Sequence, residues 1–198
     1  TDHTFCPPQK RSYVLVAAIL ASSLGFIDGT VISIAVPAIR ADLSASLTGV
    51  QWVSSAYLLM VSSLVMAGGA LGDRFGLRNI FAAGIVLFLV ASVLCALAPD
   101  AGFLVAARAL QGLGAAIMIP GSLAIIAKAY PPSERGRAIG IWAAASAITS
   151  ALGPIGGGAI LSATGDWGWR LIFAINLPLG SIALAVLFRA PADEPEGR

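Results

Sequence analysis

Two ionisable residues lie deep inside apolar stretches of this sequence. Asp28 is followed by GTVISIAVP, and Arg108 is preceded by GFLVAA. If these stretches cross a membrane, an isolated charge near the centre costs at least about 2.5–3.5 kcal/mol, so each side chain should face a cavity or a partner. A carboxylate and a guanidinium could pair there, or change partners as a proton binds and leaves. The alternative is a permanent salt bridge that only joins two helices.

Residues for enzymatic chemistry are scarce. His3 is the only histidine, and Cys6 and Cys95, in a polar tail and an apolar run, are not expected to form a disulfide. The sequence shows no metal-ligand cluster and no nucleophile–base pair, and its glycine-rich stretches lie in apolar runs rather than in strand-to-helix turns that bind phosphate. We therefore expect no enzyme, no metal site and no cofactor.

The composition is that of a membrane protein. Hydrophobic residues make up 58% of the chain, charged residues only 11%, and the mean hydropathy is +0.88. A soluble domain needs roughly 25% charged residues to hydrate its surface, whereas lipid accepts an apolar exterior. The net charge of +2 is small and the basic residues form no stripe with interleaved aromatics, so nucleic acid is not an expected partner.

Six stretches are long enough to cross a bilayer, since a spanning helix needs roughly 20 apolar residues. The sequence thus predicts an all-α membrane protein with a cytoplasmic tail at 1–12, a bundle at 13–189 and the start of a cytoplasmic linker at 190–198. The six predicted spans are Tyr13–Val36, Trp52–Leu71, Asn79–Ala98, Phe103–Lys128, Ala138–Ser162 and Leu171–Phe188.

Basic residues orient the predicted spans. With a cytoplasmic amino terminus, nine fall inside and only Arg40 and Arg170 outside, which by the positive-inside rule places both termini in the cytoplasm. Trp52, Trp167 and Trp169 then fall at the outer interface, which such amphipathic rings prefer. The nine inside residues are Lys10, Arg11, Arg74, Arg78, Lys128, Arg135, Arg137, Arg189 and Arg198.

The two intramembrane charges have similar predicted depths. Asp28 lies eight residues before Val36, and Arg108 lies five residues after Phe103. At a rise of about 1.5 Å per residue, these positions are about 12 Å and about 8 Å from the outer ends of their spans. An ion pair between the two helices is therefore geometrically possible.

Both charges belong to motifs that resemble those of the major facilitator superfamily, specifically its 14-helix drug:proton antiporter branch. Residues 27–37, IDGTVISIAVP, resemble its helix 1 signature, with Ser33 where Asn is common. Residues 104–116, LVAARALQGLGAA, resemble its helix 4 motif, which includes Gln111, Gly112 and Gly114. The resemblance implies that Asp28 takes part in proton or cation coupling and that Arg108 influences its proton affinity.

Residues 69–78, GALGDRFGLR, resemble the superfamily's loop motif between helices 2 and 3, with Leu77 in place of a basic residue. Gly76 allows a tight turn, and Asp73 could cap a helix start or pair with Arg135 or Arg137. The resemblance implies a cytoplasmic gate; an anchoring loop is the alternative. The expected gate residues are Gly69, Asp73, Arg74, Gly76, Arg78, Arg135 and Arg137.

Two further motifs lie near the end of the chain. Residues 153–158, GPIGGG, resemble the antiporter motif, which in the family separates exporters from importers; Thr149 stands where that motif begins with Gly. Pro154 should kink its helix, and an ordinary proline kink is the alternative. Residues 169–180, WRLIFAINLPLG, resemble the opening of helix 6. The residues concerned are Gly153, Pro154, Gly157 and Gly158, and Trp169, Arg170, Asn176 and Pro178.

The resemblance covers residues 27–180 and implies one six-helix bundle built as a 3+3 inverted repeat, the amino-terminal half of a transporter in the cell inner membrane. The expected function is proton-coupled export of lipophilic or cationic small molecules, with the proton gradient as energy source and a carboxy-terminal half as partner. Export of a specific metabolite, antibiotic or siderophore and a non-transporting membrane module remain alternatives.

Overall fold

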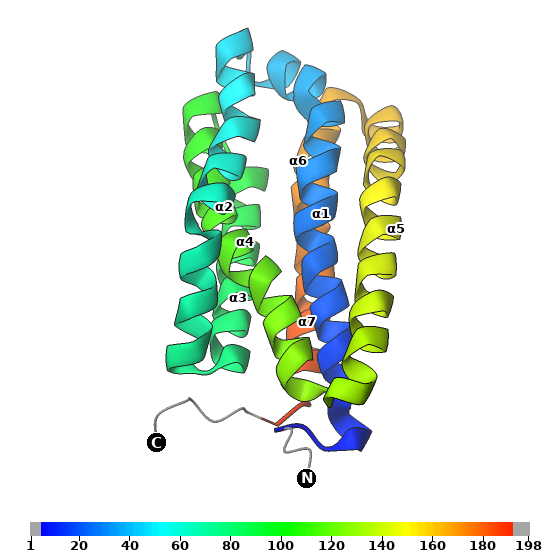
Figure 1. The fold of residues 1–198 in the computed structure, drawn as a ribbon. Coiled ribbons are helices and arrows are strands. Elements are labelled where there is room, and N and C mark those ends of the chain that lie inside the picture. Colours follow the sequence, from blue (N-terminus) through cyan, green and yellow to red (C-terminus); the bar gives the residue numbers. More distant parts are fainter. Residues whose placement is uncertain (1–4, 192–198) are drawn as a thin grey trace.

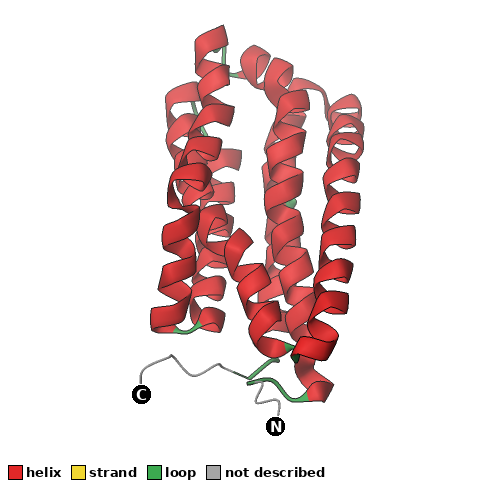
Figure 2. Ribbon diagram, viewed as in Figure 1, coloured by secondary structure: helices red, strands yellow, loops and turns green. Residues whose placement is uncertain are grey.

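The structure is a computed structural model that describes residues 5–191, except the side chains at positions 70 and 73. All regular structure in this part is helical (Figure 2), which confirms the predicted all-α fold. The long helices are α1 Arg11–Asp42, α2 Leu47–Phe75, α3 Leu77–Ala96, α4 Ala101–Ala129 and α5 Pro132–Thr164. The shorter ones are the 3-10 helices η1 Pro8–Lys10 and η2 Gly165–Gly168, and the α-helices α6 Trp169–Ala174 and α7 Asn176–Leu187.

The helices stand side by side in one bundle (Figure 1). Helix α4 packs against α2 and α3, and α1 packs against α5 and α7. Only Ile175 separates α6 from α7, and Pro178 explains this break: it has no N–H to donate to the carbonyl of Ala174, and its ring crowds that carbonyl. The beginning of α1 and the end of α7 lie at the same end of the bundle.

Local sequence sets the helix starts and the turns. Ser46 caps α2 by accepting a hydrogen bond from the Gly49 N–H at 3.1 Å, and Asp100 caps α4 in the same way. Gly76 and Gly165, which end α2 and α5, have φ of 90° and 71°, values that favour glycine. Asp73 lies within α2 and Gly76 is the N-cap of α3; the Asp73 side chain is outside the described part, so the suggestion that it caps a helix start stays a prediction.

Five helical stretches of the described chain are long and apolar enough to cross a membrane, where the sequence led us to expect six. The helix ends also differ: α1 continues six residues beyond Val36, through Pro37, to Asp42. The fifth stretch, Pro132–Leu187, has 56 residues and contains the last two predicted spans, because the linking segment is itself helical. As helix it would measure about 84 Å, more than twice the ~30 Å apolar thickness of a bilayer, and the chain reverses at Gly165 within it.

Two apolar clusters fill the bundle, one toward each end. The cluster nearer the termini includes Leu24 of α1 and Ala115 of α4, and the other includes Val31 and Leu104 of the same helices. The outer surface is apolar too: Met66, for example, is 87% exposed. Such a surface suits lipid or another apolar surface rather than water.

Candidate functional site

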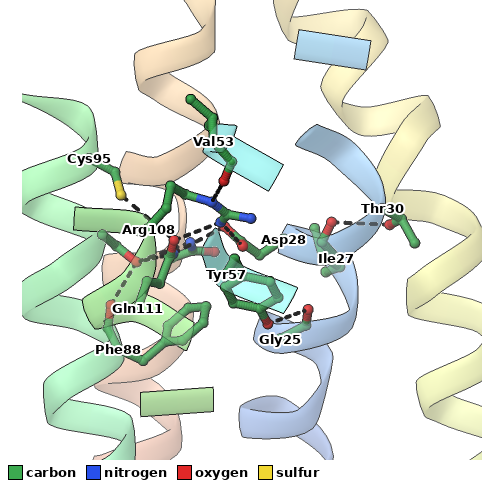
Figure 3. Close-up of polar contacts among 12 residues, drawn as sticks. Gly25, Ile27, Asp28, Thr30, Val53, Tyr57, Phe88, Cys95, Arg108 and Gln111 are labelled. Atoms are coloured by element: carbon green, nitrogen blue, oxygen red, sulfur yellow. Dashed lines mark hydrogen bonds and ion pairs between the residues drawn. The ribbon is translucent and has the colours of Figure 1, made fainter. Parts of the chain in front are cut away.

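The two charged residues singled out from the sequence meet where the two apolar clusters adjoin. Asp28 on α1 and Arg108 on α4 form an ion pair through Oδ2 and Nη1 (Figure 3). The Arg108 side chain is fully buried and that of Asp28 is 1% exposed. Desolvating two charges is costly, so a pair buried this deeply needs further hydrogen bonds to be tolerated.

Arg108 finds such partners on three helices. Its Nε donates to the backbone carbonyl of Val53 on α2 at 3.1 Å, and its Nη1 donates to Gln111 Oε1 at 2.7 Å. The guanidinium carbon lies 4.3 Å from the ring centroid of Tyr57 and 5.7 Å from that of Phe173 on α6. Ring faces attract cations, most strongly where water is excluded. The guanidinium therefore has stabilising contacts besides Asp28.

Asp28 is held by the amide of Gln111. Gln111 Nε2 donates to Asp28 Oδ1 at 3.1 Å and to Ser92 Oγ on α3 at 2.9 Å. Ser92 Oγ also accepts a hydrogen bond from Asn176 Nδ2 on α7 at 3.2 Å. All of these side chains are buried. A single polar network therefore joins α1, α3, α4 and α7 at the level of the ion pair.

The helix 4 motif places these groups through its spacing and its glycines. Arg108 and Gln111 are three residues apart and so project from one face of α4. A Cβ at Gly112 would lie 2.5 Å from the carbonyl oxygen of Tyr57, and one at Gly114 would lie 2.7 Å from the backbone nitrogen of Phe88. Real Cβ atoms do not approach so closely, so both glycines are needed for α2 and α3 to pack this tightly on α4.

The residues that resemble the antiporter motif lie on α5, where this helix packs against α1. A Cβ at Gly153 would lie 2.7 Å from Thr30 Oγ1, and one at Gly157 would overlap Val31 Cγ2, whereas one at Gly158 would meet nothing within 4 Å. Helix α5 continues unbroken through Pro154. Thr149 donates to Ser23 Oγ on α1 at 3.1 Å. Two of the four motif residues thus make the close contact with α1.

A cavity of about 210 Å³ lies between α1, α5 and the α6–α7 segment. Its lining is almost entirely aliphatic, with Thr149 as its one hydroxyl-bearing residue. It has no charged side chain with which to bind an ion.

The helix 6 motif contributes to two separate places. Asn176 joins the buried network, while Arg170 Nη2 pairs with Asp42 Oδ2 at the end of α1 at 3.0 Å and its Nη1 donates to the carbonyls of Ala96 and Ala98. Trp169 is fully buried and donates to the same Asp42 oxygen, so its predicted position at a lipid interface is wrong. Trp52 and Trp167 are 52% and 54% exposed, as an interface position requires.

The described contacts of the expected gate arginines are with backbone carbonyls and an aromatic ring. Arg78 Nη2 donates to the Phe188 carbonyl at 3.4 Å, Arg74 stacks on its neighbour Phe75, and Arg135 bonds the Tyr130 carbonyl. The end of α2 and the beginning of α5 lie at the same end of the bundle and are separated in this view (Figure 1). Gly69 has open space around it, and the Asp73 side chain is outside the described part.

Several residues of the site escaped the sequence analysis. Tyr57, Ser92 and Phe173 belong to apolar spans, where serines and aromatic residues are common and carry no positional signal. The Val53 carbonyl is a backbone group that no sequence pattern identifies.

Comparison with known proteins finds relatives for most of the chain. A family model described as Major Facilitator Superfamily matches residues 18–198. The methylenomycin A resistance protein of Bacillus subtilis is 41% identical over 94% of this chain and 41% of its own length. The probable actinorhodin transporter of Streptomyces coelicolor is 41% identical over 97% of this chain and 33% of its own length, and the puromycin resistance protein of Streptomyces alboniger is 42% identical over 97% and 38%.

Solved structures are similar as well. The crystal structure of a bacterial homolog of the human lysosomal transporter Spinster, inward-facing and unoccupied, matches with a TM-score of 0.78 at 27% identity, over 97% of this chain and 46% of that one. The chain thus spans less than half the length of each of these relatives.

Proposed function

Because the chain belongs to the Major Facilitator Superfamily, we propose that it is the amino-terminal half of a proton-coupled antiporter that exports lipophilic small molecules. The family consists of transporters and not enzymes, and the chain is a multi-pass membrane protein. The observation that carries the proposal is the fully buried pair of Asp28 and Arg108. The 14-helix drug:proton antiporter branch and the cell inner membrane are parts of this proposal.

In the proposed topology the chain crosses the membrane six times with both termini in the cytoplasm. The reversal at Gly165 and the common end of α1 and α7 support this. A 3+3 inverted repeat relates α1 to α4, α2 to α5 and α3 to α6–α7. Such a repeat makes the contact between α2 and α4 equivalent to the contact between α5 and α1, and both pairs of helices pack closely. A second bundle would complete the transport cavity.

The proposed coupling step is protonation of Asp28 from outside. A neutral carboxyl no longer attracts Arg108, whose charge stays compensated by the Val53 carbonyl and the Tyr57 ring. Since the pair is closed to solvent in this conformation, proton entry requires a state in which α1 and α4 have separated. Proton binding and the change in access are thereby linked, with no cofactor other than the proton gradient.

The remaining motif residues take their proposed roles from the family. The α2–α3 turn and Arg135 and Arg137 would form the cytoplasmic gate together with the second bundle. The close contact of Gly153 and Gly157 with α1 would be the part of the antiporter motif that favours export over import.

The proposed substrates are lipophilic, often cationic molecules. Two of the similar proteins are named for resistance to methylenomycin A and to puromycin. A second candidate is export of one specific compound, which the similarity to a probable actinorhodin transporter favours. A screen for substrate-dependent proton flux in proteoliposomes separates the two: many responding compounds support drug export, and a single one supports the second candidate.

The decisive test is pH-driven efflux by the full-length protein in membrane vesicles, with puromycin and ethidium as probes. Asp28→Asn should abolish it, because an amide cannot exchange the proton. Asp42→Asn removes the acid of the partly exposed pair on the same helix and should leave most of the transport. Undiminished efflux by Asp28→Asn would contradict the role of Asp28 in proton coupling.

A further inference from the structure

The amide of Gln111 is fully engaged, and this fixes the direction of the hydrogen bonds around Asp28. Its Oε1 must be the group that faces Arg108 Nη1 at 2.7 Å, because a guanidinium can only donate. Its Nε2 therefore holds both donors, which go to Asp28 Oδ1 and to Ser92 Oγ. In this arrangement Gln111 can only donate to Asp28, as suits an ionised carboxylate.

Ser92 extends this network to α7. Its Oγ accepts from both Gln111 Nε2 and Asn176 Nδ2, and its own proton goes to the Phe88 carbonyl at 2.8 Å. Asn176 is the first residue of α7, directly after the break at Ile175. The network thus runs from the carboxyl of Asp28 to the one interruption in the α6–α7 segment.

A proton on Asp28 is incompatible with these directions. One carboxyl oxygen faces N–H groups of Gln111 and the other faces those of Arg108, so a new O–H would point at a donor. Arg108 cannot accept, but Gln111 can if its amide turns by half a rotation. The turn brings Nε2 toward Arg108 Nη1, so it requires Arg108 to move away once the neutral carboxyl no longer attracts it. Its oxygen then faces Asp28 and Ser92, so Ser92 must release the Phe88 carbonyl and donate to Gln111. The charge state of Asp28 therefore decides which way the Ser92 hydroxyl points.

We propose that Gln111, Ser92 and Asn176 are positioning residues that transmit the protonation of Asp28 to the start of α7. The inference rests on the proposed function, since it requires Asp28 to take up a proton. When the Ser92 hydroxyl turns, Asn176 becomes the sole donor to its oxygen, and the hydrogen bonding of the first residue of α7 changes. The break at Ile175 allows α7 to respond while α6 stays attached to Asp42 through Trp169 and Arg170.

The other titratable groups near Asp28 are few. They are Arg108 on α4, Tyr57 on α2 and Cys95 on α3, whose thiol donates to Gln111 Oε1 at 3.7 Å. Beyond Arg137 α5 contains no ionisable residue, α7 contains none, and Arg170 of α6 is paired with Asp42. The main competing influence on the Gln111 amide is therefore Arg108, which favours the donor arrangement seen here.

The test is an infrared titration of the full-length protein in lipid, which follows the C=O band of a protonated carboxyl against pH; Asp28→Asn identifies the band. Ser92→Ala removes the acceptor that keeps the Gln111 N–H groups facing Asp28, so the amide turns more easily to accept from the protonated acid. The midpoint should rise by about half a pH unit, the size of one modest hydrogen bond. Ser122→Ala is the matched control: Ser122 is an equally buried serine, hydrogen-bonded to Ser22 outside this network, and its loss should not move the midpoint.

Asn176→Ala should move the midpoint the opposite way, by a smaller amount. Without the Asn176 donor, Ser92 Oγ is a better acceptor for Gln111 and the present arrangement is favoured. In a Ser92→Ala background the same substitution should have no effect, because its influence passes through Ser92 Oγ.

Three outcomes overturn the inference. If Ser92→Ala behaves like Ser122→Ala while the Asp28 band titrates, transmission is excluded and the proposed function stands. If Asn176→Ala shifts the midpoint equally with and without Ser92, the two residues act independently and the path to α7 is excluded. If no Asp28 band appears at any pH at which the protein stays folded, the inference and the proposed function both fail. Should Ser92→Ala not fold, Ser92→Cys keeps the volume, accepts only weakly, and should raise the midpoint in its place.

Discussion

Helix α1 contacts its neighbours α4 and α5 by different physical means. Toward α4 it presents Asp28, and the contact consists of a buried ion pair and its hydrogen bonds. Toward α5 it presents Val31 and Thr30, which fit against Gly157 and Gly153 with no charge between them. At this level of the bundle, one contact depends on charge and the other on shape. An ion pair between Arg11 and Glu134 also joins α1 to α5, but it lies where the two helices begin.

This difference indicates which of the two helix contacts can open when a proton binds and which one stays closed. A contact made by close packing does not respond to a proton, and small changes of volume in it cost free energy. A contact made by a carboxylate and a guanidinium loses its attraction when the carboxylate is protonated. We therefore expect α1 and α5 to move as one unit and the contact between α1 and α4 to be the one that opens.

The largest effect should come from breaking the charged contact on one side only. Arg108→Met leaves the Asp28 carboxylate buried without its cation and should lower the free energy of unfolding by about 3–5 kcal/mol. The double variant Asp28→Asn with Arg108→Met removes both charges and should recover most of that loss. Reversible unfolding in mixed detergent micelles measures both; a loss below 1 kcal/mol for Arg108→Met would show that charge does not dominate this contact.

The shape-dependent contact should respond to a single methyl group. Gly157→Ala places a Cβ against Val31, whose β-branched side chain has little freedom to turn away, and should cost about 1–3 kcal/mol. Gly156→Ala, one residue earlier, meets nothing within 4 Å and should be neutral or stabilise the helix by about 0.5–1 kcal/mol. The same unfolding measurement applies, and neither difference should depend on pH. Equal effects of the two variants would contradict the close contact.

The smallest effect should come from a charged contact that is not deeply buried. Arg170 and Asp42 join α6 to α1 with side chains 21% and 26% exposed. Arg170→Gln should cost about 1 kcal/mol, because solvent and salt screen such pairs. The cost should shrink at high ionic strength, unlike that of Arg108→Met. If salt affects both variants alike, burial is not what distinguishes the two pairs.

The sequence predicted the all-α fold and indicated that Asp28 and Arg108 could pair, because hydropathy, length and depth along a helix are local properties. It misjudged Trp169, whose position near a helix end suggested a lipid interface although the ring is fully buried beside Asp42. It also suggested a pairing of Asp73 with Arg135 or Arg137, which stays a prediction because the Asp73 side chain is outside the described part. The error at Trp169 concerns which neighbour a side chain faces, and local sequence patterns do not specify that neighbour.

By itself the sequence determined that the chain is a set of apolar helices with one acid and one arginine inside them. Because a charge in lipid costs free energy, it also indicated that these two residues face a partner or a cavity. Only the tertiary structure decided how each helix is turned about its axis, and therefore that Gln111, Ser92 and Asn176 join the ion pair to α7. The rotation of a helix is set by packing against all of its neighbours at once, with the glycines of α4 and α5 fixing the closest approaches. The proposed proton switch depends on both: on charges visible in the sequence and on hydrogen-bond directions that exist only in the folded bundle.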